Sequence, residues 1–394
     1  MKKILWFVIC TFLFLMPISA LEVEFNSENI IIYNYDINEV VYEKDSDEVI
    51  SIASMTKIMT ALVLIENIND LDTKVVLNQN HFRGVNPSAS VAGFRKGQKV
   101  TYRDLLHGIL LPSGADAVSA LAVEVFGSNE RLVEKMNERV KGLGLTHTNF
   151  INPVGLDDEG HYSTLREVSI FLMEALKNDT FKKIFTTRKY LTSDKSLTLY
   201  STIVAPLDVI NKDADYIIGS KTGYTTDAGR CLSTLLYDDE HNIYYLMVTA
   251  HAKNKVEPVM DVINTYEYLV GNYSNHTIVK NGDVVKSIKT KYAKEKEVDV
   301  VVSDTVEIFL KNSEFDKSKL VFNYEIPEEL NKIMKQDSKI GTLTIFYGDE
   351  KIKTMDLLLA EDMNFSFGRF IFKTILPLSL LAIICVLIFK KKHS

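Results

Sequence analysis

The chain has 394 residues, of which 46% are hydrophobic and 25% are charged. This composition excludes intrinsic disorder as the default state, and the length allows two domains, each with a core of its own. The formal net charge is -7, and no basic cluster occurs outside the two ends of the chain. We therefore expect no nucleic-acid partner.

Residues 1–20 have the features of a secretory signal peptide. Two lysines precede an apolar run from Ile4 to Met16, and Pro17 and small residues follow it. An uncleaved anchor helix is the alternative, but the run is short for a membrane span and ends at a proline. We expect cleavage after Ala20 and export of the remaining chain.

The next part of the chain, residues 21–274, is predicted to form a first domain. Alternating residues predict a strand pair over residues 30–43, and an apolar run predicts a helix over Ser54–Ile68. Further helices are predicted at Tyr102–Leu111, Asp116–Val125, Asn129–Gly142 and Val256–Val270, and further strands at Tyr216–Ile218, Leu232–Tyr237 and Tyr244–Ala250. Helices between the outer strands of one sheet indicate an α/β or α+β fold.

Residues 275–365 are predicted to form a separate, β-rich domain. Short alternating strands are expected at Thr277–Lys280, Val298–Val302, Val306–Leu310 and Thr342–Tyr347. The Asn281–Gly282 pair after the first of these strands suits a hairpin turn. The domain holds no cluster of histidines, cysteines or paired carboxylates, so we expect a spacer, with a surface for a partner as the alternative.

Residues 370–389 are predicted to be a transmembrane helix, since about 20 mostly apolar residues make about 30 Å of helix. Lysines follow in residues 390–394, which the positive-inside rule makes a cytoplasmic tail. The chain would then be a single-pass membrane protein with its body outside the cell. Cys231 is the one cysteine between the two apolar ends, which leaves no intramolecular disulfide after processing.

Ser54 and Lys57 are the first candidates for catalysis. Their spacing places both on one face of the predicted apolar helix, one turn apart. A lysine buried there would lose its charge, and a neutral lysine beside a serine hydroxyl can act as its general base. By chance this pattern is common, but an otherwise apolar helix does not bury a lysine without a reason.

A second candidate lies in Ile217–Thr225, a predicted strand that a substrate could pair with. Within it, Lys221 and Thr222 offer a cation and a hydroxyl to a carboxylate, and Gly223 lets a ligand backbone approach closely. A three-residue motif of this kind is ambiguous by itself. The two motifs together, in this order and on a chain that is expected to be exported, are a far more specific signal for a serine enzyme of this kind.

The segments Ser51–Ala61 and Gly219–Thr225 together resemble those of the low-molecular-mass D-alanyl-D-alanine carboxypeptidases, penicillin-binding proteins of the peptidase S11 type. The likeness extends to the loop Asn152–Asp157, to the β domain and to the anchor. It implies a penicillin-binding-protein or β-lactamase-like transpeptidase domain, then a small all-β domain and a transmembrane helix.

The resemblance also implies the roles of individual residues. Ser54 would attack the carbonyl between two D-alanines, Lys57 would accept its proton, and water would release the acyl-enzyme. The backbone N–H groups of Ser54 and Tyr224 would form an oxyanion hole. Lys221 and Thr222 would hold the free carboxylate of the terminal D-alanine.

The partners that the resemblance implies are peptidoglycan stem peptides ending in D-Ala-D-Ala, with β-lactam antibiotics as covalent inhibitors. It implies no cofactor and no metal. The seven histidines between the apolar ends also lack the paired spacing on a helix that a zinc enzyme would need. The activity expected is removal of the terminal D-alanine during cell-wall remodelling.

The middle motif departs from the family pattern. Ser113 is present and is expected to relay protons, but Ala115 stands where an asparagine is usual, which removes a side-chain amide. Asp116 is interpreted as the cap of the following helix rather than as a substitute for that amide. Val154 is a second departure, at a loop position that is often polar in the family.

Two other functions remain open. A serine β-lactamase would share Ser54, Lys57 and the Lys221 strand, but no E-x-x-L-N element lies between Ser113 and Lys221 to supply its deacylating base. A wall-binding scaffold that has lost turnover through Ala115 would bind penicillin without cutting peptide.

Overall fold

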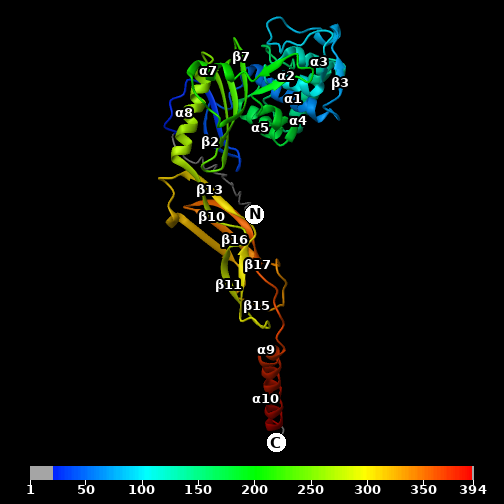
Figure 1. Ribbon diagram of the computed structural model, residues 1–394. Helices are drawn as coiled ribbons and strands as arrows, with labels where there is room; N and C mark the ends of the chain where they lie inside the picture. The colour runs from blue at the N-terminus through cyan, green and yellow to red at the C-terminus, as the bar shows by residue number, and fades with distance from the viewer. Residues whose placement is uncertain (1–20, 393–394) are drawn as a thin grey trace, which may run out of the picture. The chain divides into compact units, whose positions relative to one another are not determined.

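The computed structural model describes residues 21–392, so the predicted signal peptide and the last two residues lie outside the described part. The described chain divides into two compact units, one ending at Gly271 and one starting at Asn272 (Figure 1). Each unit is built around a sheet of its own.

The first unit is organised by one antiparallel sheet with the strand order β2-β1-β9-β8-β7. Its strands are β1 (Asn29–Asn34), β2 (Glu39–Lys44), β7 (Ile217–Thr225), β8 (Gly229–Asp238) and β9 (Ile243–Ala252). The predicted strand pair over residues 30–43 is confirmed as β1 and β2. Because β1 pairs with β9, the hairpin β1-β2 near the start of the described chain completes a sheet whose other three strands come about 200 residues later.

Helices cover the sheet of the first unit on both faces. They are α1 (Thr56–Glu66), α2 (Tyr102–Leu110), α3 (Ala115–Phe126), α4 (Asn129–Gly142), α5 (Leu165–Leu176), α6 (Asp179–Phe185), α7 (Val204–Ile210) and α8 (Glu257–Asn272). Figure 1 shows α8 on one side of the sheet and α1 to α5 on the other. All residues of α1 except Glu66 are buried, because α2 to α6 pack around it. The α+β expectation is confirmed.

Short elements connect the helices on the α1 side. They are a 3₁₀ turn at Ala53–Met55, β3 (Lys74–Val76), a 3₁₀ turn at Gln79–Phe82, β4 (Lys99–Thr101), β5 (Lys189–Leu191) and β6 (Thr198–Tyr200). The strands among them form two small hairpins, β3 with β4 and β5 with β6.

The second unit contains a six-stranded sheet with the order β14-β16-β17-β12-β11-β15, together with the pair β10-β13. Its strands are β10 (Tyr273–Val279), β11 (Val284–Thr290), β12 (Glu297–Val302), β13 (Val306–Lys311), β14 (Leu320–Glu325), β15 (Glu329–Leu330), β16 (Lys339–Tyr347) and β17 (Glu350–Leu359), with a 3₁₀ turn at Lys317–Lys319. The hairpin predicted at Asn281–Gly282 is wrong. That turn leads from β10 into β11, which belong to different sheets, because β10 pairs with β13 and β11 pairs with β12.

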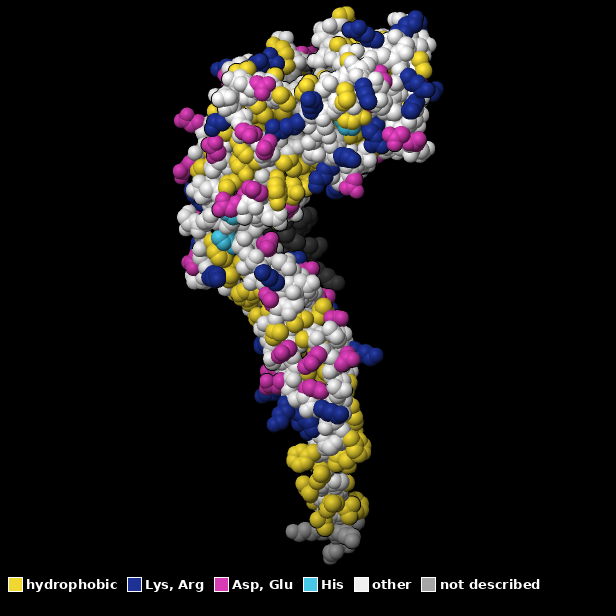
Figure 2. Space-filling model, in the orientation of Figure 1, with side chains coloured by type: hydrophobic (Ala, Val, Ile, Leu, Met, Phe, Trp, Pro, Cys, Tyr) yellow, Lys and Arg dark blue, Asp and Glu magenta, His cyan; other side chains and the backbone are white. Residues whose placement is uncertain are grey.

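A continuous apolar helix ends the second unit. It comprises α9 (Phe367–Phe370), a π-helical turn (Ile371–Ile375) and α10 (Leu376–Lys392). The stretch Phe367–Phe389 is long and apolar enough to cross a membrane. Its most apolar 18 residues have a mean hydropathy of 2.5, and none of them is buried inside the protein. Figure 2 shows hydrophobic side chains covering this helix.

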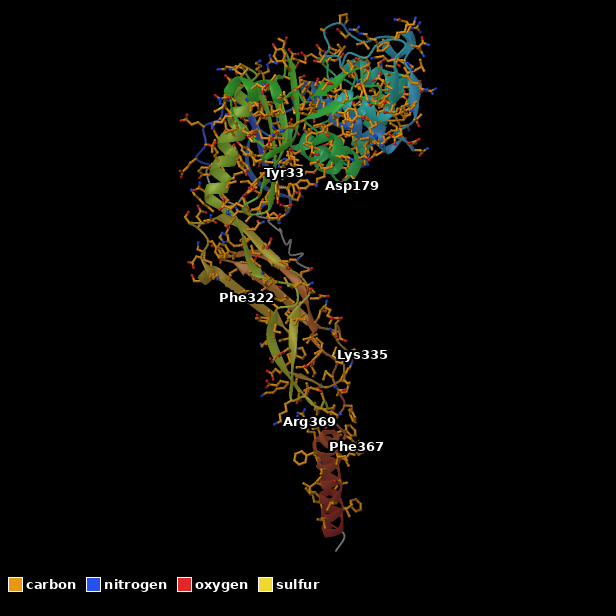
Figure 3. The ribbon with its side chains drawn as sticks, viewed as in Figure 1. Tyr33, Asp179, Phe322, Lys335, Phe367 and Arg369 are labelled. Carbon is orange, nitrogen blue, oxygen red and sulfur yellow. The ribbon has the colours of Figure 1, made fainter. Side chains whose placement is uncertain are left out.

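The first turn of the apolar helix is joined to the β domain by Arg369, which Figure 3 labels beside Phe367. The Arg369 guanidinium donates hydrogen bonds to the carbonyl oxygens of Ala293, at 2.6 Å, and Glu295, at 2.9 Å. It also donates to the carbonyl oxygen of Thr290 at 3.0 Å. The helix therefore begins as a fixed part of the β domain rather than after a free linker.

Candidate active site

The 3₁₀ turn before α1 positions Ser54, and the first turn of α1 positions Lys57. The Lys57 side chain is only 1% exposed. Its ammonium nitrogen donates to the Ser54 hydroxyl oxygen at 3.0 Å and to the carbonyl oxygen of Val154 at 2.7 Å. The two residues that the sequence places on one helix face are thus in direct contact.

Burial changes the chemistry of Lys57. Desolvation lowers the pKa of Lys57 to about 7, and the negative charge of Asp116 opposes part of this shift. A substantial neutral fraction of the amine therefore exists at neutral pH. A neutral amine within hydrogen-bond reach of a serine hydroxyl has the geometry and the pKa of a general base.

The loop after α4 supplies the second partner of Lys57 through its backbone. The Asn152 side-chain oxygen accepts from the N–H groups of Val154, at 3.2 Å, and Gly155, at 2.8 Å, and so holds the loop in one shape. Gly155 has a φ of +81°, and a Cβ there would lie 1.9 Å from the Ala53 carbonyl oxygen. The loop therefore presents the Val154 carbonyl to Lys57, and the polarity of the Val154 side chain has no part in this contact.

Ser113 lies between α2 and α3 in a left-handed backbone conformation, with a φ of 65°. Its hydroxyl oxygen accepts a hydrogen bond from the Lys221 ammonium at 3.0 Å. Ala115 begins α3 and offers no side-chain donor, in keeping with the departure noted in the sequence. Within the described residues, Ser113 makes no hydrogen bond to Lys57 or Ser54.

The interpretation of Asp116 as a helix cap is wrong, because Gly114 is the N-cap residue of α3. The Asp116 carboxylate instead accepts hydrogen bonds from the N–H groups of Ala92, at 2.7 Å, Gly93, at 2.9 Å, and Phe94, at 3.0 Å. It thereby anchors the chain segment that follows Ser90, a residue that lines the catalytic cavity.

Strand β7 forms the opposite wall of the site, at the edge of the sheet. Lys221 is 0% exposed, and its ammonium also donates to the carbonyl oxygen of Thr222 at 2.7 Å. Burial, together with the positive charge of Lys57, holds the pKa of Lys221 well below its usual range. A Cβ on Gly223 would lie 3.1 Å from the Ser54 nitrogen, so a glycine is what allows β7 to approach the nucleophile this closely.

A cavity of about 320 Å³ opens between Ser54 and β7. Its polar lining consists mainly of hydroxyl groups, those of Ser54, Ser88, Ser90, Ser113, Thr202, Thr222 and Tyr224. Two cationic side chains, Arg230 and Lys255, also line it, and within residues 21–392 no aspartate or glutamate does. The cavity can thus hold a small ligand that carries a negative charge.

Sequence reasoning missed Arg230, Thr202 and the Val154 carbonyl. Thr202 accepts a hydrogen bond of 2.6 Å from the Thr222 hydroxyl, although it lies in an irregular segment with no motif. Arg230 could have been found from the strand pairing, because the turn after Thr225 folds β8 back along β7. A backbone carbonyl leaves no signal in residue types.

Cys231 also lines the catalytic cavity, opposite Gly223 on the neighbouring strand, but no hydrogen bond joins it to Ser54, Lys57, Ser113 or Lys221 in the described residues. Burial raises the pKa of the Cys231 thiol to about 12, and its sulfur contacts the Ala228 carbonyl oxygen at 3.4 Å. Over residues 21–392, no three histidine, cysteine, aspartate or glutamate side chains gather as a metal site.

Comparison with known proteins agrees with this arrangement. Residues 16–252 match the model of the D-alanyl-D-alanine carboxypeptidase family, peptidase S11, and residues 273–364 match that of the penicillin-binding protein 5 C-terminal domain. The D-alanyl-D-alanine carboxypeptidase DacF of Bacillus subtilis is 30% identical over 350 residues, which cover 87% of each chain.

Solved structures show the same fold. Penicillin-binding protein 5 of Haemophilus influenzae superposes with a TM-score of 0.67 at 21% identity, covering 87% of this chain and 98% of that one. The carboxypeptidase DacD of Francisella tularensis gives a TM-score of 0.61 at 20% identity and covers 87% and 95%. With a buried lysine in contact with Ser54 beside a Lys-Thr-Gly edge strand, and a family match over more than half its length, the chain belongs to the serine-type D-alanyl-D-alanine carboxypeptidases, the low-molecular-mass penicillin-binding proteins of the S11 type.

Proposed function

We propose that this chain removes the terminal D-alanine from peptidoglycan stem peptides, with Ser54 as the nucleophile and Lys57 as its general base. The observation that carries this proposal is the 3.0 Å contact between the Lys57 amine and the Ser54 hydroxyl. Burial lowers the pKa of this lysine to about 7, so that part of it is uncharged at neutral pH.

Acylation begins when the Ser54 oxygen attacks the carbonyl carbon of the penultimate D-alanine and its proton passes to Lys57. The negative charge that develops on the carbonyl oxygen is stabilised by the backbone N–H groups of Ser54 and Tyr224. The close approach of β7 at Gly223 supports this pairing of donors. Collapse of the tetrahedral intermediate breaks the C–N bond and leaves an ester on Ser54.

The leaving amine needs a proton as the C–N bond breaks. Ser113 is suited to deliver it, because its hydroxyl faces the cavity and accepts a hydrogen bond from Lys221 at 3.0 Å. Lys221 also donates to the Thr222 carbonyl at 2.7 Å and so holds Thr222 on the side where the free carboxylate of the leaving D-alanine would lie. Free D-alanine then departs.

Deacylation follows when water attacks the Ser54 ester. Among the residues that the structure describes, Lys57 is the base in contact with the Ser54 oxygen, and it would take the proton from this water. The cavity lining contains no carboxylate that could activate water independently of Lys57. This disfavours efficient release of a penicilloyl group, and so it favours a carboxypeptidase that β-lactams trap over a β-lactamase.

The helix Phe367–Phe389 supports a single-pass anchor, with the catalytic unit outside the cell and lysines 390–392 inside. The Arg369 hydrogen bonds would join the β domain directly to that anchor. An enzyme held in this way would act on peptidoglycan near the membrane surface.

Mass spectrometry of the full chain in detergent, incubated with benzylpenicillin or with a peptide ending in D-Ala-D-Ala, tests this function. We expect a penicilloyl adduct on Ser54, the loss of one D-alanine from the peptide, and neither result with Ser54→Ala. An adduct without peptide cleavage would favour the scaffold, and rapid release of hydrolysed penicillin would favour the β-lactamase. Absence of any adduct would refute the assignment of Ser54.

A further inference from the structure

His161 and His107 are buried histidines that the acylation and deacylation steps do not use. His161 is 2% exposed and His107 is 6% exposed. Burial lowers the pKa of each ring to about 4, so both are neutral near pH 7. Of the two, His161 is the one that is hydrogen-bonded to the elements around Lys57 in the described part of the chain.

Both ring nitrogens of His161 are hydrogen-bonded. Its Nδ1 atom accepts from the N–H group of Ile151 at 3.2 Å. A ring nitrogen that accepts carries no proton, so the proton of the neutral ring lies on Nε2. Nε2 then donates to the Thr56 hydroxyl oxygen at 2.8 Å. His161 therefore bridges the loop of residues 151–156 to the first turn of α1.

The two ends of this bridge lie on either side of the catalytic base. Thr56 immediately precedes Lys57 in α1, and Ile151 begins the loop whose Val154 carbonyl accepts from the Lys57 amine at 2.7 Å. Loop and helix are in tight contact there, because a Cβ on Gly155 would lie 2.9 Å from the Thr56 hydroxyl oxygen. The bridge thus sets how closely the loop covers Lys57.

The surrounding chain holds His161 in this position. Its neighbour Tyr162 exchanges two backbone hydrogen bonds with Asn149, of 3.0 and 3.1 Å, and its own N–H donates to the Asp158 carbonyl oxygen at 2.9 Å. The Phe150 ring lies edge-on to the imidazole, with the ring centroids 5.5 Å apart. An imidazole fixed on several sides loses little further side-chain entropy when it makes its two hydrogen bonds.

The basicity of Lys57 depends on how well the loop covers it. Desolvation is the main cause that lowers the pKa of Lys57 to about 7, and the Val154 carbonyl covers the amine from the loop side. The charged groups that act on Lys57 or on His161 are Asp116, Lys221, Asp157 and Asp158. Because the His161 ring is neutral, its removal would take away no charge. A loosened loop would therefore act through hydration, and water that reaches the amine would raise its pKa.

We propose that His161 is a positioning residue for acylation, which fixes the 151–156 loop on α1 and so keeps Lys57 covered and aimed at Ser54. Without the bridge, the loop would move away from α1, and water would replace the Val154 carbonyl as the acceptor for the amine. Lys57 would still contact Ser54, but as a more hydrated and more basic group. His161 itself exchanges no proton in the reaction. The proposal rests on the proposed function for the reaction that it serves.

The test is the pH dependence of penicillin acylation in matched variants. Full-length wild type, His161→Ala, Thr56→Val and His107→Ala would be mixed rapidly with a fluorescent penicillin in detergent, from about pH 5 to about pH 10. Thr56→Val removes the other end of the bridge and nearly keeps the shape of the side chain. His107→Ala is the control, because this second buried ring stacks on Tyr190 at 3.6 Å and bonds the Arg103 carbonyl of its own helix.

We expect His161→Ala and Thr56→Val to move the inflection of the acylation rate upward from about pH 7 by about one pH unit. The rate at pH 7 should then fall about fivefold, because the neutral fraction of Lys57 drops from about one half to about one tenth. At about pH 10 the rate should return to within about threefold of wild type, since the base is then fully neutral in every variant. His107→Ala should keep the inflection of wild type, even where it lowers the melting temperature.

A merely structural role of His161 predicts a different result. It would lower the acylation rate by one factor at every pH and leave the inflection near pH 7, and that result in both bridge variants would overturn the proposal. An equal shift of the inflection in His107→Ala would overturn it too. The double variant His161→Ala/Thr56→Val should shift the inflection no further than His161→Ala does, and additive shifts would contradict a shared bridge. If His161→Ala does not fold, the result with Thr56→Val decides.

Hydrogen exchange separates the proposal from the function on which it rests. The Ile151 amide, which donates to His161, should exchange faster in His161→Ala and in Thr56→Val than in wild type. If wild type forms no penicilloyl adduct, the proposed function fails, whereas faster exchange still supports the bridge and unchanged exchange overturns it. If wild type is acylated and both variants keep its inflection and its slow exchange, the function stands and the role of His161 fails.

Discussion

The buried position of Lys57 predicts how acylation depends on pH. With a pKa of about 7, half of the Lys57 amines are neutral at that pH. An exposed lysine with its usual pKa of about 10.4 would be neutral in only about one molecule in 2,500 at pH 7. Because the neutral amine is the base, the rate of acylation should rise with pH and level off once Lys57 is fully deprotonated.

The expected magnitude follows from the neutral fraction. It is about 1% at pH 5 and nearly complete at pH 9 for a group with a pKa near 7, so acylation should increase about 100-fold between these values. The second-order rate constant for acylation by a fluorescent penicillin, measured from pH 5 to pH 9 by rapid mixing, tests this. The carboxylate of the β-lactam stays ionised over this range and adds no inflection.

Two variants sharpen the measurement. Lys57→Ala should lower the rate by about 10²- to 10⁴-fold and abolish the inflection. Ser113→Ala is the matched control, because Ser113 contacts Lys221 rather than Lys57, and this variant should keep the inflection near pH 7. A wild-type rate that is flat from pH 5 to pH 9, or one that still rises steeply at pH 9, would refute Lys57 as the neutral base.

Three further predictions follow from single contacts. Gly155→Ala should lower both the melting temperature and the rate of penicillin acylation, because its Cβ would collide with the Ala53 carbonyl and displace the loop that faces Lys57; unchanged values in both assays would show that the loop adapts. The Cys231 thiol should resist iodoacetamide at pH 8 in the folded chain and react after denaturation, since its pKa is raised to about 12; rapid native labelling in a peptide map would contradict its burial. Arg369→Ala should speed amide hydrogen exchange in residues 290–296 and leave cleavage of a soluble peptide unchanged, because the lost hydrogen bonds lie in the second unit; slow exchange in the variant would mean that the helix is tied to the β domain by other contacts.

Local patterns were enough to predict much of the fold. The alternation over residues 30–43 and the helical periodicity of Asn129–Gly142 both reappear in the structure, the latter with the same bounds. The Asn281–Gly282 turn shows the limit of such patterns. A turn motif specifies a change of chain direction, but the partner of the strand that follows is selected by long-range pairing.

The catalytic pair was predictable because its geometry is local. Ser54 and Lys57 are separated by one helical turn, so their spacing alone brings the amine to the hydroxyl. Asp116 was misassigned because an acidic residue near a helix start has two possible uses. Only the tertiary structure decides between capping its own helix and binding the N–H groups of residues 92–94.

What the sequence determined by itself is the chemistry of short range: an apolar helix that carries a serine and a lysine, a Lys-Thr-Gly strand, and an apolar end long enough to span a membrane. The tertiary structure decided which distant groups meet these residues. It placed the Val154 carbonyl on Lys57 and Ser113 on Lys221, and it turned Arg230 into the cavity beside Thr222. Contacts of this kind depend on how loops and strands far apart in the chain pack together. They involve backbone atoms, which nearly every residue shares, and strand registers, which long-range pairing selects, so the residue types alone do not reveal them.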